Sequence, residues 1–228
     1  MLNLNFILIF VPPNTNKNMQ NKAKELILIA QRIRALSQTA LTYSRNEYEI
    51  ERSKEMITVS DRIVSLVGGM DEKEIQTLYT PVKEYITPKV DIRAVIFNVK
   101  DEILLVKEQA DGRWSLPGGW SDVGFTPKEV VVKEAKEETG FDVEVIRLLA
   151  VFDKKCWNHP SSTFYIYKMC FLCKLTGTGN DELTFDILDK GFFALDNLPT
   201  LSLDRILPEQ IQLLDELRRN PQMPLYCD

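Results

Sequence analysis

Histidine and cysteine are scarce in this chain, and the cysteines lack the spacing of a metal site. The 228 residues include one histidine, His159, and four cysteines. Cys170 and Cys173 lie in an expected strand, where residues three apart point to opposite faces. With so few nitrogen and sulphur ligands we expect no zinc centre. The four thiols are expected to remain free in a reducing cytoplasm.

A surplus of positive charge and a long apolar run are also lacking. The 33 Asp and Glu residues outnumber the 28 Lys and Arg residues, which gives a net charge of -5. No long basic run is present, so we expect no dedicated nucleic-acid partner. The apolar run at residues 4–11 is too short to span a bilayer and lacks the basic flank of a secretory signal. We therefore expect no membrane association and a cytoplasmic location.

The first part of the chain predicts a short extension followed by a helical domain. Residues 1–18 combine the apolar run with Pro12-Pro13 and several asparagines, so we expect a disordered extension. Met19 precedes a clean helical pattern and competes with Met1 as the natural start. Residues 19–86 form the expected helical domain, in which Gly69 ends the second helix and Asp71 caps a short third one.

Two apolar stripes mark the first two helices of this domain. They consist of Leu26, Ile29, Ile33 and Leu36 in the first helix and of Ile50, Met56, Ile57, Ile63 and Leu66 in the second. Acidic and basic residues are balanced here. We expect a helical hairpin that packs on the catalytic domain or on a second subunit.

The period of the apolar residues changes from helical to alternating after Thr87-Pro88, which predicts a domain rich in strands over residues 87–220. Residues 90–97 and 102–109 are expected to pair around a turn near Lys100-Asp101. Further strands are expected at residues 143–152, 164–175 and 191–194, and an amphipathic helix at residues 208–219. This order predicts an α/β fold, a mixed sheet covered by helices on both faces, with a C-terminal tail at residues 221–228.

Three carboxylates form the most informative pattern in this domain. Glu134, Glu137 and Glu138 stand at positions i, i+3 and i+4 of an expected helix, which places them on one face. Like charges at this spacing repel one another. A divalent cation such as Mg2+ or Mn2+ removes that repulsion, because both ions take oxygen ligands.

The helix that carries these carboxylates has clear signals at both ends. Thr126 is the expected N-cap, Pro127 suits the first helical position, and Glu129 completes a capping box. Gly140 is placed to end the helix in the left-handed conformation. The residues expected to face the core are Val131, Val132 and Ala135. Before the helix, residues 116–119 (Leu-Pro-Gly-Gly) predict a tight turn that approaches a bound ion.

The segment resembles the Nudix box: Gly, five residues, Glu, seven residues, Arg-Glu, an apolar residue, one residue, Glu-Glu, one residue, Gly and an apolar residue. The positions that match are Gly119, Glu134, Ala135, Glu137, Glu138, Gly140 and Phe141. Two positions depart, because Phe125 replaces the first Glu and Lys133 replaces the Arg. Lys133 keeps the charge that orients the carboxylates but loses the planar guanidinium fork.

Other segments are similar to one Nudix subgroup, described as ADP-ribose pyrophosphatase-like and including CDP-choline pyrophosphatases. They are residues 41–44, 87–94, 114–124 and 191–193. The resemblance implies an α/β/α sandwich, a preceding helical domain and a homodimer. It also implies hydrolysis of a nucleoside diphosphate derivative, with CDP-choline as first substrate and ADP-ribose as the alternative.

The resemblance implies a role for each box residue. The carbonyl of Gly119 and the carboxylates of Glu134, Glu137 and Glu138 would hold Mg2+ or Mn2+, and Lys133 would orient them. The ions would clamp the diphosphate and activate a water molecule. Nudix enzymes differ in their general base, so Glu134 and Asp186 are both candidates, together with the neighbouring loop acids Glu182 and Asp189.

Substrate contacts are expected from Arg93, Trp114 and His159, each with an ordinary structural alternative. Arg93 meets a phosphate or pairs with Asp91 or Glu108. Trp114 stacks on a base or packs in the core. His159 lines the mouth of the pocket or is simply exposed.

Two rival functions are weaker. A Nudix-fold sensor or regulator usually loses the carboxylates and adds a basic winged helix, whereas here the triplet is intact and few residues follow Leu201. An RNA-processing Nudix enzyme fits the acidic charge balance poorly, and salt-sensitive RNA binding would support it.

Overall fold

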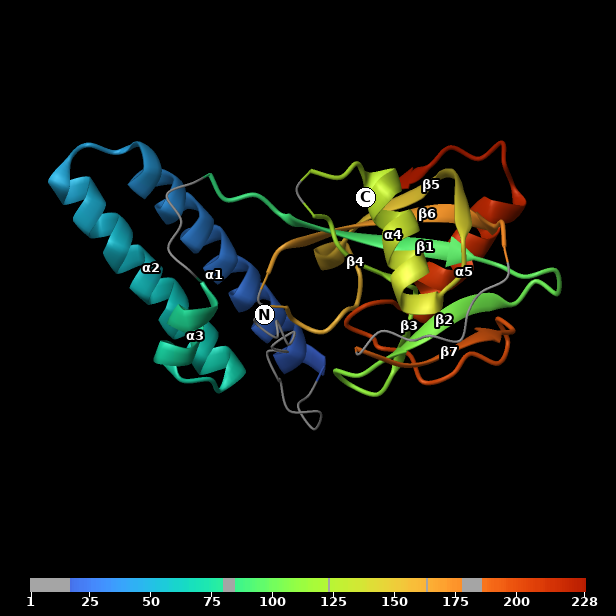
Figure 1. Ribbon diagram of the computed structural model, residues 1–228. Helices are drawn as coiled ribbons and strands as arrows, with labels where there is room; N and C mark the ends of the chain where they lie inside the picture. The colour runs from blue at the N-terminus through green and yellow to red at the C-terminus, as the bar shows by residue number, and fades with distance from the viewer. Residues whose placement is uncertain (1–16, 80–84, 123, 163, 178–185) are drawn as a thin grey trace. The chain divides into compact units, whose positions relative to one another are not determined.

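The computed structural model describes residues 17–79, 85–122, 124–162, 164–177 and 186–228 (Figure 1). The predicted extension therefore lies almost wholly outside the described residues. The chain divides into two compact units. Met1–Pro88 and Pro160–Tyr165 form one unit, and Lys89–His159 and Ile166–Asp228 form the other. The helices among the described residues contain no apolar stretch of the length that a bilayer crossing requires.

The N-terminal unit contains the helices α1 (Lys17–Tyr43), α2 (Glu47–Gly68) and α3 (Glu72–Leu78). Their ends follow local capping rules. Asn46 accepts a hydrogen bond from Tyr48 N at the start of α2, and Asp71 forms a capping box at the start of α3. Gly69 ends α2 with a φ of 67°, a left-handed value that glycine adopts without a steric penalty. The predicted C-terminal end of α2 and the predicted start of α3 are confirmed.

The buried apolar core of this unit contains none of the predicted stripe residues, although the half-buried Ile63 of the second stripe packs against it. It consists of Ile27, Ala30, Val64 and Ile75. Leu26, Ile29 and Leu36 are instead 43%, 45% and 49% exposed. The hairpin thus buries the helix face beside the first stripe, whose own residues are exposed or half-buried.

The second unit contains two sheets (Figure 1). The five-stranded sheet has the order β4-β1-β6-β5-β8, and the three-stranded sheet has the order β3-β2-β7. The strands are β1 (Lys89–Ile96), β2 (Ile103–Glu108), β3 (Trp114–Ser115), β4 (Gly118–Trp120), β5 (Val143–Asp153), β6 (Ile166–Leu175), β7 (Ile187–Phe193) and β8 (Tyr226–Cys227). The 3-10 turn η1 (Lys154–Cys156) follows β5. Strand β1 runs parallel to β6 and antiparallel to β4, so the larger sheet is mixed, as predicted.

Helices α4 (Pro127–Thr139) and α5 (Pro208–Arg219) cover opposite faces of the larger sheet (Figure 1). The residues on the α4 side include Ile92, Ala94, Val130, Val131 and Ala135. The residues on the α5 side include Val95, Leu149, Ile211, Leu214 and Leu217. Adjacent residues of β1 thus enter different layers, which gives the predicted α/β/α sandwich. The expectation that Val132 faces the core was wrong, because Val130 and Val131 fill that side of α4 and Val132 is exposed.

One local prediction in this unit fails, and the C-terminal segment contains a short strand. The expected hairpin of β1 and β2 is reduced to a single bridge between Phe97 and Ile103, although the turn at Asp101 is present with a φ of 62°. The long-range partners β4 and β6 occupy both edges of β1. The predicted C-terminal tail contains β8, which pairs with β5, and Asp228 accepts hydrogen bonds from Asp153 N and Trp157 Nε1.

Candidate active site

Helix α4 begins and ends as the sequence predicts. Thr126 Oγ1 accepts a hydrogen bond from Glu129 N, and Glu129 Oε2 accepts one from Thr126 N at 2.7 Å. Gly140 follows the last turn with a φ of 70°. The caps fix the length of the helix and therefore the position of its carboxylates relative to the preceding loop.

Gly118 and Gly119 bring the backbone into close contact with both the sheet and α4. A side chain on Gly118, whose φ is 141°, would collide with the carbonyl oxygen of Ile92. A Cβ on Gly119 would lie 2.9 Å from Glu134 Oε2. The absence of a side chain at Gly118 therefore lets the loop pack against β1, and its absence at Gly119 lets the Glu134 carboxylate approach the main chain of the loop.

Glu134, Glu137 and Glu138 together form a carboxylate ridge on α4, and Glu138 is its buried member. Its side chain accepts a 2.7 Å hydrogen bond from Gly118 N, and the residue is 8% exposed. Burial raises the pKa of Glu138 well above its usual value, and the nearby Glu108 raises it further. Arg93 and the hydrogen bond from Gly118 oppose this shift. Glu138 therefore holds a proton more tightly than an exposed glutamate does.

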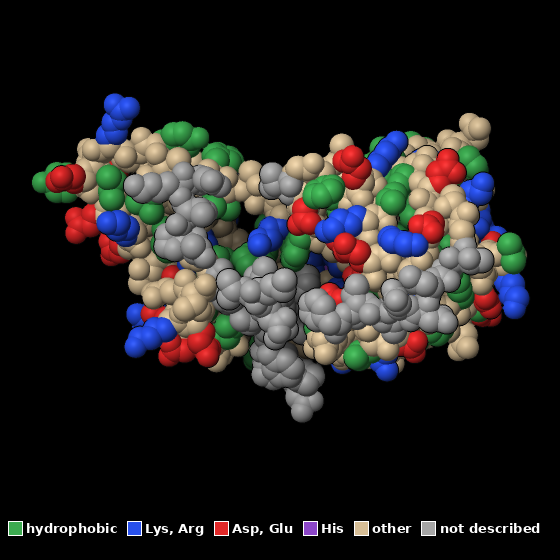
Figure 2. Space-filling view, viewed as in Figure 1, with side chains coloured by type: hydrophobic (Ala, Val, Ile, Leu, Met, Phe, Trp, Pro, Cys, Tyr) green, Lys and Arg blue, Asp and Glu red, His purple; other side chains and the backbone are tan. Residues whose placement is uncertain are grey.

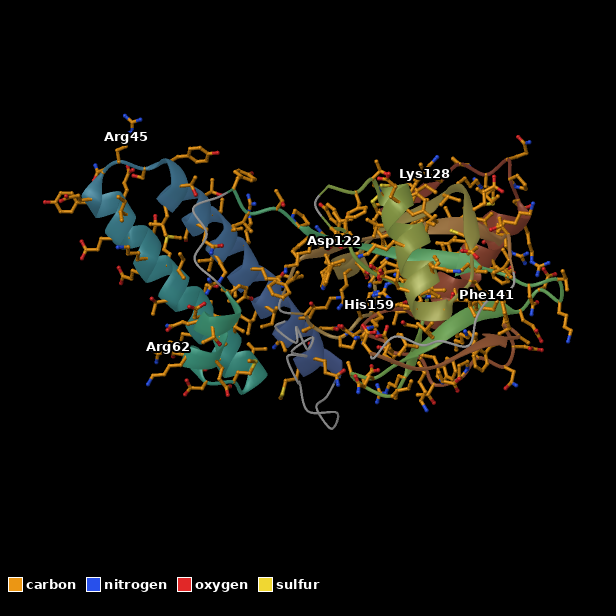
Figure 3. The ribbon with its side chains drawn as sticks, in the orientation of Figure 1. Arg45, Arg62, Asp122, Lys128, Phe141 and His159 are labelled. Atoms are coloured by element: carbon orange, nitrogen blue, oxygen red, sulfur yellow. The ribbon has the colours of Figure 1, made fainter. Side chains whose placement is uncertain are left out.

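Lys133 lies among the other two carboxylates of the ridge. Its Nζ is 3.9 Å from Glu134 Oε1 and 3.8 Å from Glu137 Oε2. It also lies 3.1 Å from Asp122 Oδ2, in the loop between β4 and α4, where Figure 3 labels Asp122. Burial raises the pKa of Glu134, and Lys133 opposes this rise. The structure thus gives Lys133 the neighbours that an orienting residue requires.

The donor atoms of the ridge suit a hard divalent cation. All are oxygens: the carboxylates of Glu134, Glu137 and Glu138 and the Gly119 carbonyl. The close approach of Glu134 to Gly119 supports the same grouping. However, no three His, Cys, Asp or Glu side chains of the described residues are already gathered in a way that could hold an ion. The ligand set therefore remains a prediction whose chemistry fits these residues.

Arg93 has protein partners for its guanidinium group. It donates to Asp91 Oδ1 and to the carbonyl oxygen of Leu116, both at 2.9 Å, and is 3% exposed. Asp91 also pairs with Lys168. This is the alternative in which Arg93 pairs within the protein, and it ties β1 to the loop that leads into Gly118 and Gly119. A phosphate contact by Arg93 remains a prediction.

The number of buried charged residues behind the loop had no clear signal in the sequence. Glu108 accepts a 2.6 Å hydrogen bond from Ser115 Oγ and lies 3.1 Å from Arg205 Nε. Lys154 pairs with Asp204, and burial lowers the pKa of Lys154 to about 8. A charged residue at an inward position of a strand, such as Glu108, was the available signal. Its partners come from distant segments that local patterns do not connect.

In the second unit Trp114 is half-buried against the core and His159 is buried. The Trp114 ring meets Phe193 edge to face, with 4.7 Å between ring centroids, which agrees with its core alternative. His159, labelled in Figure 3, is 4% exposed and its Nδ1 lies 2.7 Å from the carbonyl oxygen of Leu203. The alternative of an exposed loop histidine was wrong, because this carbonyl holds the ring inside. Substrate contacts by both residues remain predictions.

Asp186 is exposed immediately before β7, and its carbonyl oxygen accepts a hydrogen bond from Gln109 N at 2.8 Å. Asp189 is exposed within β7. Glu182 lies outside the described residues. The role of Asp186 as a general base remains a prediction.

A capped glutamate helix beside a Gly-Gly loop, on one face of an α/β/α sandwich, is the arrangement of a Nudix hydrolase. Residues 87–217 match the family described as NUDIX domain. Residues 24–79 match a second family, described as UDP-X-like, N-terminal oligomerisation domain. The chain belongs to the Nudix hydrolase family.

Two relatives match most of this chain, and a third matches about three fifths of it. "Putative ADP-ribose pyrophosphatase YjhB" of Bacillus subtilis is 40% identical over 199 residues, which cover 87% of this chain and 95% of the relative. The crystal structure of a UDP-X diphosphatase is 35% identical with a TM-score of 0.58, covering 90% of this chain and 99% of that one. An ADP-ribose pyrophosphatase structure from Streptococcus suis is 44% identical with a TM-score of 0.56, covering 62% and 100%.

Proposed function

We propose that this protein hydrolyses the diphosphate bond of a nucleoside diphosphate linked to a small moiety, with the help of Mg2+ or Mn2+. The observation that carries this proposal is the contact between the loop and the ridge. Glu138 binds Gly118 N, and Glu134 lies where any side chain on Gly119 would meet it. Gly119, Glu134, Glu137 and Glu138 would hold the cation, which would neutralise diphosphate oxygens and acidify a water molecule.

The protein groups around the site would position the reactants. Glu134 is our first candidate for the base that takes the proton of the attacking water, because its pKa is raised by burial and it lies against the loop. Asp186 is the second candidate, as an exposed carboxylate before β7. Attack on one phosphorus would release two phosphomonoesters, and electrostatic stabilisation would supply much of the rate enhancement.

For the substrate we propose ADP-ribose or CDP-choline. The names of the Bacillus subtilis and Streptococcus suis relatives support ADP-ribose, whereas the subgroup resemblance of the sequence favoured CDP-choline. ADP-ribose would yield AMP and ribose 5-phosphate, and CDP-choline would yield CMP and phosphocholine. Arg93, Trp114 and His159 remain the proposed residues on the substrate side. Figure 2 shows acidic and basic side chains interspersed on the visible face of the second unit. This mixture of charges supports a small nucleotide rather than a nucleic acid as the substrate.

The test is a hydrolysis assay of the full chain with ADP-ribose, CDP-choline and UDP-sugars, with Mg2+, Mn2+ or EDTA. Ion-exchange chromatography would separate the monophosphate products. Glu137→Gln should abolish turnover and leave the fold intact, whereas Asp142→Asn is a matched control on an exposed carboxylate beyond α4 that pairs with Lys136. Failure of the unaltered protein to cleave any of these compounds with either ion would refute the proposal.

We also propose that the protein is a cytoplasmic homodimer whose subunits meet through the exposed apolar stripe of α1 and α2. The family description of residues 24–79 as an oligomerisation domain supports this assembly. In α1 the stripe includes Leu26, Ile29 and Leu36, and in α2 Leu66 is 77% exposed. The free thiols are those expected in a reducing compartment.

Burial of such a stripe against a second copy would remove apolar surface from water. Leu36→Lys should therefore shift the mass measured by light scattering from dimer to monomer. Val99→Lys, a change at an exposed apolar residue of the second unit, is the control. A Leu36→Lys protein that remains a dimer would show that the stripe is not the interface.

A further inference from the structure

The loop before α4 contains a carboxylate that the Nudix box does not assign. Asp122 lies between β4 and α4, three residues before the position where the box has its first glutamate and this chain has Phe125. Its Oδ2 accepts a 3.1 Å hydrogen bond from Lys133 Nζ. Lys133 stands where the box has its arginine. The two departures from the box are therefore joined, in space, through one additional acidic residue.

Phe125 contributes to the same contact. The Lys133 ammonium lies 5.8 Å from the centroid of the Phe125 ring, within the range of a cation–π interaction. A backbone contact of 3.4 Å, from Phe125 N to the Asp122 carbonyl oxygen, closes the turn between them. Position 125 thus still faces residue 133, but the negative charge in the loop comes from position 122.

The contact matters because Lys133 competes with a cation for the ridge. Its Nζ is within 4 Å of both Glu134 and Glu137. An ammonium group at this place offsets the charge that a divalent ion needs. A carboxylate on the loop side holds the ammonium away from full engagement with the two glutamates and fixes the loop to α4.

We propose that Asp122 is a positioning residue of the metal site: it binds Lys133 and thereby leaves Glu134 and Glu137 available to the cation. Asp122 thus supplies the loop carboxylate that the box has at position 125, where this chain has Phe125. This inference rests on the metal site proposed above. Its test measures cation binding without substrate, so that a failure of the substrate proposal does not affect it.

The experiment is a titration of the full-length protein with Mn2+, in which free Mn2+ is measured by electron paramagnetic resonance. In Asp122→Asn, Lys133 turns to the two ridge carboxylates, and the affinity for Mn2+ should fall about three- to fivefold, the upper part of the range for exposed ion pairs. Asp142→Asn is the matched control, since Asp142 pairs with Lys136 on the same helix at 2.9 Å. Its Mn2+ affinity should equal that of the unaltered protein.

A second variant separates the loss of the loop carboxylate from a loss of structure. Asp122→Asn combined with Phe125→Glu returns a carboxylate to the loop at the box position, within reach of Lys133, and should restore Mn2+ affinity. The KM for the nucleotide should change less than the Mn2+ concentration needed for half-maximal rate. Unchanged Mn2+ affinity in Asp122→Asn, or a loss that Phe125→Glu does not restore, would overturn the proposal.

Discussion

The buried carboxylate of Glu138 predicts a trade between stability and metal binding. The residue is 8% exposed, and burial raises its pKa well above the usual 4.5. Between pH 4.5 and this raised pKa the folded state holds more protons than the unfolded state does. The free energy of unfolding therefore falls as the pH rises through that window. Each unit of pKa elevation corresponds to about 1.4 kcal/mol.

Glu138→Gln should remove this loss of stability at higher pH. The amide is neutral, is similar in shape and still offers an oxygen to Gly118 N. In EDTA, the variant should gain stability over the unaltered protein as the pH is raised from 5 to 8, by about 1.4 kcal/mol per unit of pKa elevation. The measurement is urea denaturation of both proteins at each pH. A difference in the free energy of unfolding that stays constant with pH would refute the argument that Glu138 is the source of the cost.

Addition of Mg2+ or Mn2+ should make the unaltered protein more stable than Glu138→Gln. A cation at a hundred times its dissociation constant stabilises the folded state by about 2.7 kcal/mol. The unaltered protein should show this gain on addition of Mg2+ or Mn2+. The Glu138→Gln protein should show much less, and it should have lost its hydrolytic activity. Equal stabilisation of both proteins by the ion would exclude Glu138 from the ligand set.

Two further predictions concern neighbouring contacts. Gly119→Ala places a Cβ 2.9 Å from Glu134 Oε2, so the carboxylate must move. Turnover should fall at least about tenfold, as it does for other small displacements of catalytic groups. The circular dichroism spectrum should be unchanged. Lys154→Met leaves Asp204 buried without its ion-pair partner and should cost about 3–5 kcal/mol in urea denaturation, whereas the double variant Lys154→Met/Asp204→Leu should recover most of this loss. The pKa of Lys154 is lowered to about 8 in the folded protein, so above pH 8 the folded state binds fewer protons at this residue than the unfolded state does. The contribution of Lys154 to the free energy of unfolding should therefore rise between pH 8 and 10.5. This rise should be missing from Lys154→Met.

The sequence predicted those parts of the fold that depend on neighbours in the chain. Thr126, Glu129 and Gly140 fix α4 through contacts within a few residues, and the structure contains all three. The hairpin of β1 and β2 failed because a local turn at Asp101 does not decide which strands compete for the edges of β1. Strands β4 and β6 occupy both edges, and their order results from long-range packing that no single segment encodes.

The site also depends on both local spacing and long-range contacts, and only the local spacing could be predicted. Spacing alone places Glu134, Glu137 and Glu138 on one face of a helix, which makes them look equivalent. In the structure their side chains differ: that of Glu137 is half exposed, that of Glu134 is 16% exposed, and Glu138 is buried. Glu138 is bound to Gly118 N of the loop, and Glu108 on another strand raises its pKa further; the helix pattern reveals neither contact.

Because the three glutamates differ in exposure, each should contribute differently to the free energy of cation binding. A cation that engages Glu137 displaces only water and an exposed lysine contact. A cation that engages Glu138 must also displace the proton that burial favours, so its affinity should increase with pH more steeply than the exposed carboxylates alone would require. Mn2+ titrations of the unaltered protein and of Glu138→Gln between pH 6 and 8 measure this directly. The pH dependence should be steeper in the unaltered protein, and parallel curves would place the cation on the exposed part of the ridge without Glu138.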